Sequence, residues 1–224
     1  MVAAALLSAL HACQAPPPRG APAARLPPAV AGGVLYGIDA AASEVLLLVR
    51  RDGTLAALGH NHVIAVHGLR GRVQLQEPAV RSQFELQFDA AQLTVDEPQL
   101  RAAVGGDFAG ELVNSAREGT RSNMLGERVL DASRNATITL QSERISGAGP
   151  QYVASTRVTV RGRETLLEVP LQLQLEVDTL TARGEFVLRQ SGLGLPPFSV
   201  MLGALRVADE LTVRFRIVAR RVAV

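Results

Sequence analysis

The stretch LEVPLQLQLEV at residues 167–177 decides the fold class, because apolar and polar side chains alternate along its whole length. Every odd position from Leu167 to Val177 is apolar, and the even positions carry Glu, Pro or Gln. Successive side chains of a β-strand point to opposite faces of the sheet, so this period of two predicts a strand with one dry face and one wet face. Residues 211–220, LTVRFRIVAR, repeat the pattern near the end of the chain.

The same alternation elsewhere predicts about eight strands. They are expected at residues 43–50, 63–76, 82–89, 136–145, 152–161, 166–177, 183–190 and 210–221, with residues 34–39 as an extension of the first. Joints rich in Gly and Pro, such as residues 146–150, suit reversals between antiparallel neighbours. Residues 97–131 lose the period, and residues 122–130 suit a short helix that covers one end. An all-β barrel with a short helical insertion is favoured over a sandwich, because closure protects the sheet edges.

The composition excludes several classes of function. The chain has 224 residues, 47% of them hydrophobic, which is enough for a packed core. All 23 basic residues are Arg, and without Lys there is no Walker A loop, lysine Schiff base or kinase ATP site. A net charge of +2 gives no sign of a nucleic-acid partner, and a single Cys excludes a disulfide scaffold. No nucleophile elbow occurs, and we interpret the Asp96-Glu97 pair as a solvated turn at a strand end, so we expect no enzyme.

The first 33 residues look like an export signal followed by a tether. Residues 1–12 contain an apolar run that is too short to span a bilayer but suits the core of a signal peptide. The tetrapeptide LHAC at residues 10–13 resembles a bacterial lipobox, although His11 stands where a small residue is usual. Residues 13–33 are rich in Pro and Ala and predict an extended tether. We therefore predict a periplasmic lipoprotein anchored through Cys13; an ordinary export signal with an incidental Cys is the alternative.

Several segments, taken in order, resemble the YceI-like family of bacterial exported proteins. They are the opening YGID at residues 36–39, FDAAQLTV at 88–95, ATITLQS at 136–142, VTVRG at 158–162 and QSGLG at 190–194. The resemblance covers residues 34–222 and sets the domain at 34–224. It implies an extended, lipocalin-like antiparallel barrel of eight strands that binds the apolar tail of a polyisoprenoid or an isoprenoid quinone without catalysis. Two segments depart from the sequence of typical family members: LGHNHVI at residues 58–64 and the Asp96-Glu97 pair. They indicate a pocket mouth that differs from that of typical members.

If the dry faces converge inside a barrel, their side chains become candidates for lining a ligand cavity. Apolar contact of this kind contributes about 25 cal/mol per Å² of buried area. The alternative is that the same side chains fill the interior completely, which would leave a module that docks a partner through its rim. The candidates are Leu47, Val49, Phe84, Leu86, Phe88, Met124, Ile138, Leu140, Leu171, Leu173, Phe186, Leu188 and Phe215.

The histidines offer a second hypothesis. His60 and His62 are two residues apart, so on a strand they point the same way and could hold one metal ion, whereas His67 falls on the opposite face. This pattern predicts a metal-binding accessory protein, unless the two imidazoles belong to a polar rim turn. We otherwise expect no cofactor beyond a bound isoprenoid lipid. The expected partners are that lipid and a membrane reached through Cys13, with a homodimer as an open alternative.

Overall fold

The barrel is closed by hydrogen bonds between its first and last strands. The structure, a computed structural model, describes residues 32–223. Its eight-membered ring runs β1-β4-β5-β7-β8-β9-β10-β12 and returns to β1, and every pairing is antiparallel. The fold class predicted from the alternation is therefore confirmed. The ring strands are β1 (Val34–Ile38), β4 (Arg70–Leu75), β5 (Gln83–Asp89), β7 (Thr137–Ala148), β8 (Gln151–Val160), β9 (Arg163–Leu175), β10 (Thr179–Arg189) and β12 (Leu205–Arg221).

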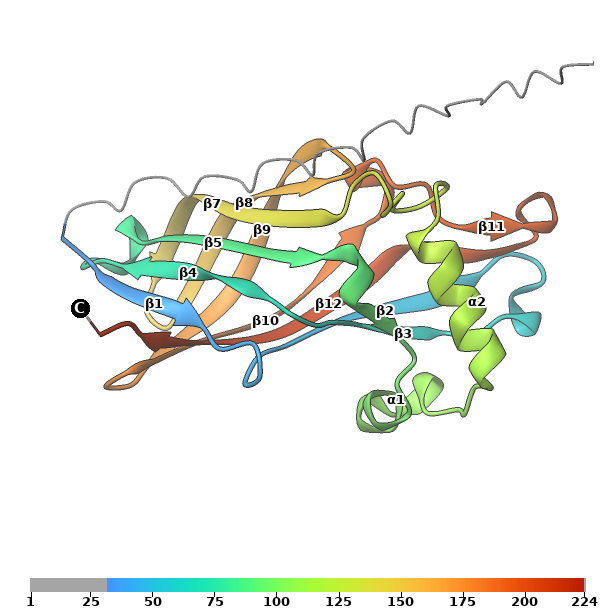
Figure 1. The fold of residues 1–224 in the computed structure, drawn as a ribbon, viewed down its shortest axis with the longest axis horizontal. Helices are drawn as coiled ribbons and strands as arrows, with labels where there is room; N and C mark the ends of the chain where they lie inside the picture. The colour runs from blue at the N-terminus through green and yellow to red at the C-terminus, as the bar shows by residue number, and fades with distance from the viewer. Residues whose placement is uncertain (1–31, 224) are drawn as a thin grey trace, which may run out of the picture.

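A second group of strands lengthens the barrel at one end. Strand β12 pairs with β1 near its C-terminus and with β2 (Glu44–Asp52) over most of its remaining length. Beyond β2 lie β3 (His62–Val66) and β6 (Leu93–Val95), and β11 (Ser199–Val200) pairs with the start of β12. Figure 1 shows β2, β3, β11 and helix α2 together at the end of the molecule opposite the C-terminus.

Two short helices lie between β6 and β7. Helix α1 (Pro98–Val104) starts with a proline at its first turn, and α2 (Asn114–Leu125) follows. The prediction of a helix at residues 122–130 is wrong in its bounds, because extended backbone at Gly126 ends α2 and residues 127–130 form turns. Neither helix is both long and apolar enough to cross a bilayer. Single 3₁₀ turns occupy η1 (Ala56–Leu58), η2 (Ala79–Arg81), η3 (Ala90–Gln92), η4 (Gly106–Phe108), η5 (Ser191–Leu193) and η6 (Met201–Gly203).

Strands β2 and β3 are buried on both faces. Their outer face packs with Phe108 and the α1 region, and Figure 1 shows α1 beside β3. The prediction of one wet face per strand is therefore wrong here. The unbroken apolar run VLLLV at residues 45–49 is the pattern expected of a strand that is covered on both sides. The outward side chains in this cluster are Leu46, Leu48, Val63 and Ala65.

The inward side chains form the core of the barrel. One cluster surrounds Val66 and Ile138 near α2, and a second surrounds Val213 and Phe215 on β12. Gly184 lies directly opposite Phe215 in the register of β10 and β12. A Cβ atom at Gly184 would stand 2.4 Å from the Pro170 carbonyl oxygen and 2.6 Å from the Phe215 ring, so only glycine fits at this position.

Candidate ligand-binding site

An apolar cavity lies inside the ring of strands, and we call it the barrel cavity. Its volume is about 170 Å³. Of its polar lining residues, Thr156 donates its hydroxyl to the Ala154 carbonyl, and the Ser82 hydroxyl accepts the Gln76 N–H. The walls are otherwise almost wholly hydrocarbon. Eight of the side chains proposed from the sequence line it: Phe84, Leu86, Phe88, Leu140, Leu171, Leu173, Phe186 and Phe215.

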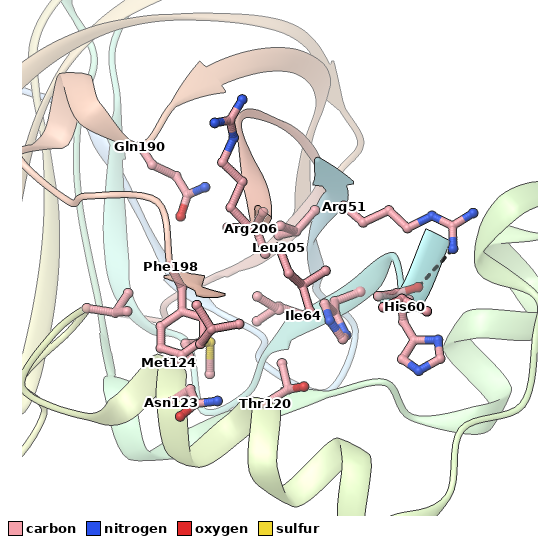
Figure 2. Close-up of a pocket in the computed structure, with 17 residues that line it drawn as sticks. Arg51, His60, Ile64, Thr120, Asn123, Met124, Gln190, Phe198, Leu205 and Arg206 are labelled. Atoms are coloured by element: carbon pink, nitrogen blue, oxygen red, sulfur yellow. Dashed lines mark hydrogen bonds between the residues drawn. The ribbon is translucent and has the colours of Figure 1, made fainter. Parts of the chain in front are cut away.

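A second pocket, the rim pocket, lies at the end that carries α2, β3 and β11. Its volume is about 260 Å³, and Val49 and Met124 from the predicted set line it. Leu58 and Val200 also line it while remaining 66% and 38% exposed, so the pocket meets solvent between the η1 and β11 loops. Figure 2 shows α2 contributing Thr120, Asn123 and Met124 to one wall, with Phe198 close to Met124.

Sequence reasoning missed much of this pocket. Phe198 precedes β11, and Leu205 and Val207 lie at the start of β12, before the residues that were predicted as a strand from alternation. Phe198 is nevertheless held in place, because the Arg128 guanidinium lies 4.9 Å from its ring centroid. The only sequence signal was an isolated aromatic residue after a Pro-Pro pair, which does not point to a pocket.

A layer of leucines separates the two spaces. Along β2, Val45 lines the barrel cavity and Val49 lines the rim pocket, so the inward side chain of Leu47 lies between them. Strand β10 repeats this order with Leu188 between Phe186 and Gln190. On β12, Leu211 follows the cavity-lining Val213 toward the rim pocket. We call Leu47, Leu188 and Leu211 the leucine layer. Ile138 is buried in the core cluster near α2 and lines neither space.

His62 and Asp96 form a buried pair at the wall of the rim pocket. The Nδ1 atom of His62 lies 2.6 Å from Oδ2 of Asp96, and the Asp96 side chain is completely buried. The Val63 N–H donates to Oδ1 of the same carboxylate at 2.8 Å. The interpretation of Asp96 as part of a solvated turn is therefore wrong: the short β6 strand carries it inward, beside β3.

A buried arginine completes this cluster. Arg101 of α1 is 4% exposed and donates from Nη1 to Oδ1 of Asp96 at 2.6 Å. Nη1 of Arg101 also donates to the Asn61 carbonyl at 2.7 Å, and its Nε donates to the Gly110 carbonyl at 2.8 Å. A buried ion pair is costly unless its other hydrogen-bonding groups are also satisfied, and among the described residues no buried side-chain atom of this pair lacks a hydrogen-bond partner.

The cluster keeps Asp96 ionised. Burial alone would raise the pKa of the Asp96 carboxyl, but hydrogen bonds from His62, the Val63 N–H and Arg101 together hold that pKa below its usual value. The neighbouring Glu97 is less buried. Desolvation would raise the pKa of Glu97, but hydrogen bonds from Thr94 and His67 lower it.

The three described histidines have separate environments. The rings of His60 and His62 both line the rim pocket, with centroids 6.5 Å apart and edge-to-face geometry. His67 lies elsewhere, with Nε2 2.6 Å from Glu97. Within residues 32–223, no group of three His, Cys, Asp or Glu side chains is arranged to hold a metal ion. A metal at His60 and His62 stays a prediction, and Cys13 lies outside the described residues.

A closed antiparallel barrel with an apolar cavity and a pocket at its rim defines the molecule as a barrel of the ligand-binding type. The model of the YceI-like domain matches residues 36–219, so the chain belongs to the YceI-like family. Among curated proteins, no match is found.

Two solved structures share the fold. BcnA of Burkholderia cenocepacia is 18% identical with a TM-score of 0.61, and the match covers 81% of this chain and 98% of that one. The YCEI protein of Campylobacter jejuni is 5% identical with a TM-score of 0.54, covering 71% of this chain and 85% of that one. These similarities concern the fold alone.

Proposed function

We propose that this protein is an exported, non-enzymatic binder that holds the apolar tail of a polyisoprenoid or isoprenoid quinone inside its barrel. The observation that carries the proposal is the barrel cavity, whose lining is hydrocarbon apart from groups such as the Thr156 and Ser82 hydroxyls, which are bonded to backbone. A pocket that offers no polar partner selects ligands that need none.

The volumes indicate how such a tail would be held. A cavity of about 150 Å³ accommodates one benzene ring, so the barrel cavity, at about 170 Å³, suits a group of the size of one isoprene unit. A longer tail has to pass the leucine layer and use the rim pocket as well. Each methylene transferred from water to such walls contributes about 0.8 kcal/mol, so affinity increases with the length of tail enclosed.

The test is to purify the protein without detergent and to measure co-purified lipid by native mass spectrometry and solvent extraction. Ala182 lines the barrel cavity, so the three carbon atoms that Ala182→Leu adds fill part of it, whereas Val187→Phe adds four carbon atoms on the outer face of the same strand, where Val187 is 63% exposed. We expect bound isoprenoid lipid in the wild type and the Val187 variant, and much less in the Ala182 variant. Lipid-free wild-type protein that also takes up no added isoprenoid would reject the proposal.

We further propose that the protein is periplasmic and anchored through an acylated Cys13. Support comes from the lipobox-like LHAC at residues 10–13 and the Pro-rich segment that follows. Such an anchor would keep the barrel near a membrane, where lipids with isoprenoid tails reside. Mass spectrometry of the mature N-terminus tests this point separately from ligand binding.

A further inference from the structure

We infer that the rim pocket is a distinct site for the polar end of the ligand, and that it binds a hydroxyl group through Nε2 of His62. The inference rests on the proposed function in one respect: the hydroxyl and the tail in the barrel cavity belong to one molecule. The hydroxyl site is nevertheless defined by its own contacts.

The first step concerns the hydrogen on the His62 ring. Asp96 is ionised and its carboxylate has only acceptors, so Nδ1 of His62, 2.6 Å away, must carry the hydrogen. In the neutral imidazole, Nε2 then has a free lone pair and accepts a hydrogen bond. No hydrogen bond among residues 32–223 uses this Nε2 atom. The side chain is 12% exposed and lines the rim pocket, so a ligand there can reach it.

The second step is that the ring is fixed before any ligand arrives. Asp96 has a φ of 57°, an uncommon conformation for a residue with a side chain, and its N–H donates to the Val63 carbonyl at 2.8 Å. The Val63 N–H returns a bond to the Asp96 side chain, and Arg101 holds the same carboxylate from α1. An imidazole oriented by a buried carboxylate is a pre-organised acceptor, which binds without the entropic cost of ordering its own ring.

The third step concerns charge. The residues that line the rim pocket include no Asp or Glu. The two arginines among them are already engaged: Arg206 bonds Asp52 at 2.8 Å, and Arg51 donates to the Gly59 carbonyl, as the dashed line in Figure 2 shows. A lone pair on Nε2 repels an anionic oxygen but accepts from an O–H group. At the Nε2 atom itself, an uncharged alcohol or phenol therefore fits better than a phosphate.

The fourth step is size. The rim pocket, at about 260 Å³, is larger than the barrel cavity, and Ile64 and Met124 give it apolar walls around the histidine. It can hold a hydroxyl group together with its first carbons while the rest of the ligand continues toward the leucine layer. This order places the polar end beside the opening at Leu58 and Val200, where solvent is close.

The experiment compares three short probes by calorimetry on the full-length, delipidated protein. Geraniol carries a hydroxyl, geranyl methyl ether replaces its hydrogen with a methyl group, and geranyl phosphate is anionic. All titrations are made at one mildly alkaline pH. We expect geraniol to bind about tenfold more tightly than the ether, because one hydrogen bond is lost.

Two variants locate the effect. His62→Phe keeps a ring but removes both nitrogens, and it should abolish the difference between alcohol and ether. His67→Gln is the matched control: it also removes an imidazole bonded to a carboxylate, but His67 pairs with Glu97 and does not line the rim pocket. The difference should persist there. If His62→Phe does not fold, the ¹⁵N signal of His62 Nε2 in the wild type gives the answer, since geraniol should shift it and the ether should not.

Equal binding of alcohol and ether, an Nε2 signal that geraniol leaves unmoved, or tightest binding by geranyl phosphate would each overturn the inference. Failure of the tail proposal has a different signature. In that case Ala182→Leu would leave the uptake of long isoprenoids unchanged, while the difference between geraniol and its ether in the rim pocket remained.

Discussion

Substitution of Leu188 tests whether the leucine layer divides the interior of the barrel. Leu188→Ala removes three carbon atoms from a half-buried position between the barrel cavity and the rim pocket. Buried Leu→Ala substitutions cost about 2–5 kcal/mol, and we expect about 2 kcal/mol here, because the side chain already borders two cavities. The neighbouring Val187, 63% exposed on the outer face, supplies the control: Val187→Ala should change the free energy of unfolding by less than about 0.5 kcal/mol.

The same substitution should strengthen binding of long ligands selectively. A tail that spans both cavities must push Leu188 aside in the wild type, at a cost of about 1 kcal/mol in rotamer strain. In the variant, that cost disappears, and ligand carbons that replace the lost side chain contribute up to about 0.8 kcal/mol each. A net gain of about 2 kcal/mol corresponds to about 30-fold in Kd.

The assay combines urea denaturation with calorimetric titration of two alcohols. Geranylgeraniol is long enough to need both cavities, and geraniol fits within one. Leu188→Ala should bind geranylgeraniol about 30-fold more tightly than the wild type does, with geraniol little changed. An equal gain for both alcohols, or none for the longer one, would refute the layer as a divider.

Three further predictions concern other parts of the chain. The folded-state pKa of Asp96 lies below its unfolded value of about 3.9, so its contribution to stability is complete above that pH and is lost as the pH falls through the folded pKa. The free energy of unfolding, measured as the pH is lowered, should therefore fall less in Asp96→Asn than in the wild type. Parallel curves for the two proteins would contradict this. Gly184→Ala should lower the melting temperature markedly, since its Cβ would lie 2.4 Å from the Pro170 carbonyl oxygen and 2.6 Å from the Phe215 ring. Gly192→Ala, for which the nearest atom is 3.9 Å away, should not, and equal shifts would refute the steric argument. Cys13→Ser should move the protein from the membrane fraction to the soluble fraction on cell fractionation, and unchanged partitioning would reject the anchor.

The fold class was predictable because its information is local: alternation at residues 167–177 and 211–220 indicates which side chains share a face, and the turn residues between strands indicate where neighbours reverse. Two strand assignments were wrong, because the predicted strand at residues 63–76 is divided into β3 and β4, and residues 34–38 form the separate ring strand β1. The helix bounds were not predictable in this way. A helix at residues 122–130 cannot continue past Gly126, where the backbone is extended. The apolar residues Val129 and Leu130, which suggested the helix, are instead buried as part of a turn.

The site was predictable only in part, for a physical reason. Alternation identifies inward side chains, yet it does not say how far those from opposite walls extend, so it could not separate Leu188, which lies between the spaces, from Phe186, which lines one. The burial of Asp96 depends on Arg101 in α1 and on His62 in β3, and pairs so distant in sequence leave no local pattern. The run VLLLV at residues 45–49 was the one available sign that this end is covered on both sides.

The covering of β2 and β3 by the α1 region makes the two walls of the rim pocket mechanically unequal. The wall that carries His62 is backed by a second hydrophobic layer, including Phe108, whereas the opposite wall is a single helix and a two-residue strand. We therefore expect any local opening that admits a ligand to involve α2 and β11, while β2 and β3 stay in place. Backbone amides of β3 should exchange with deuterium far more slowly than those of β11, and a ligand in the pocket should slow exchange in α2 and β11 more than in β3.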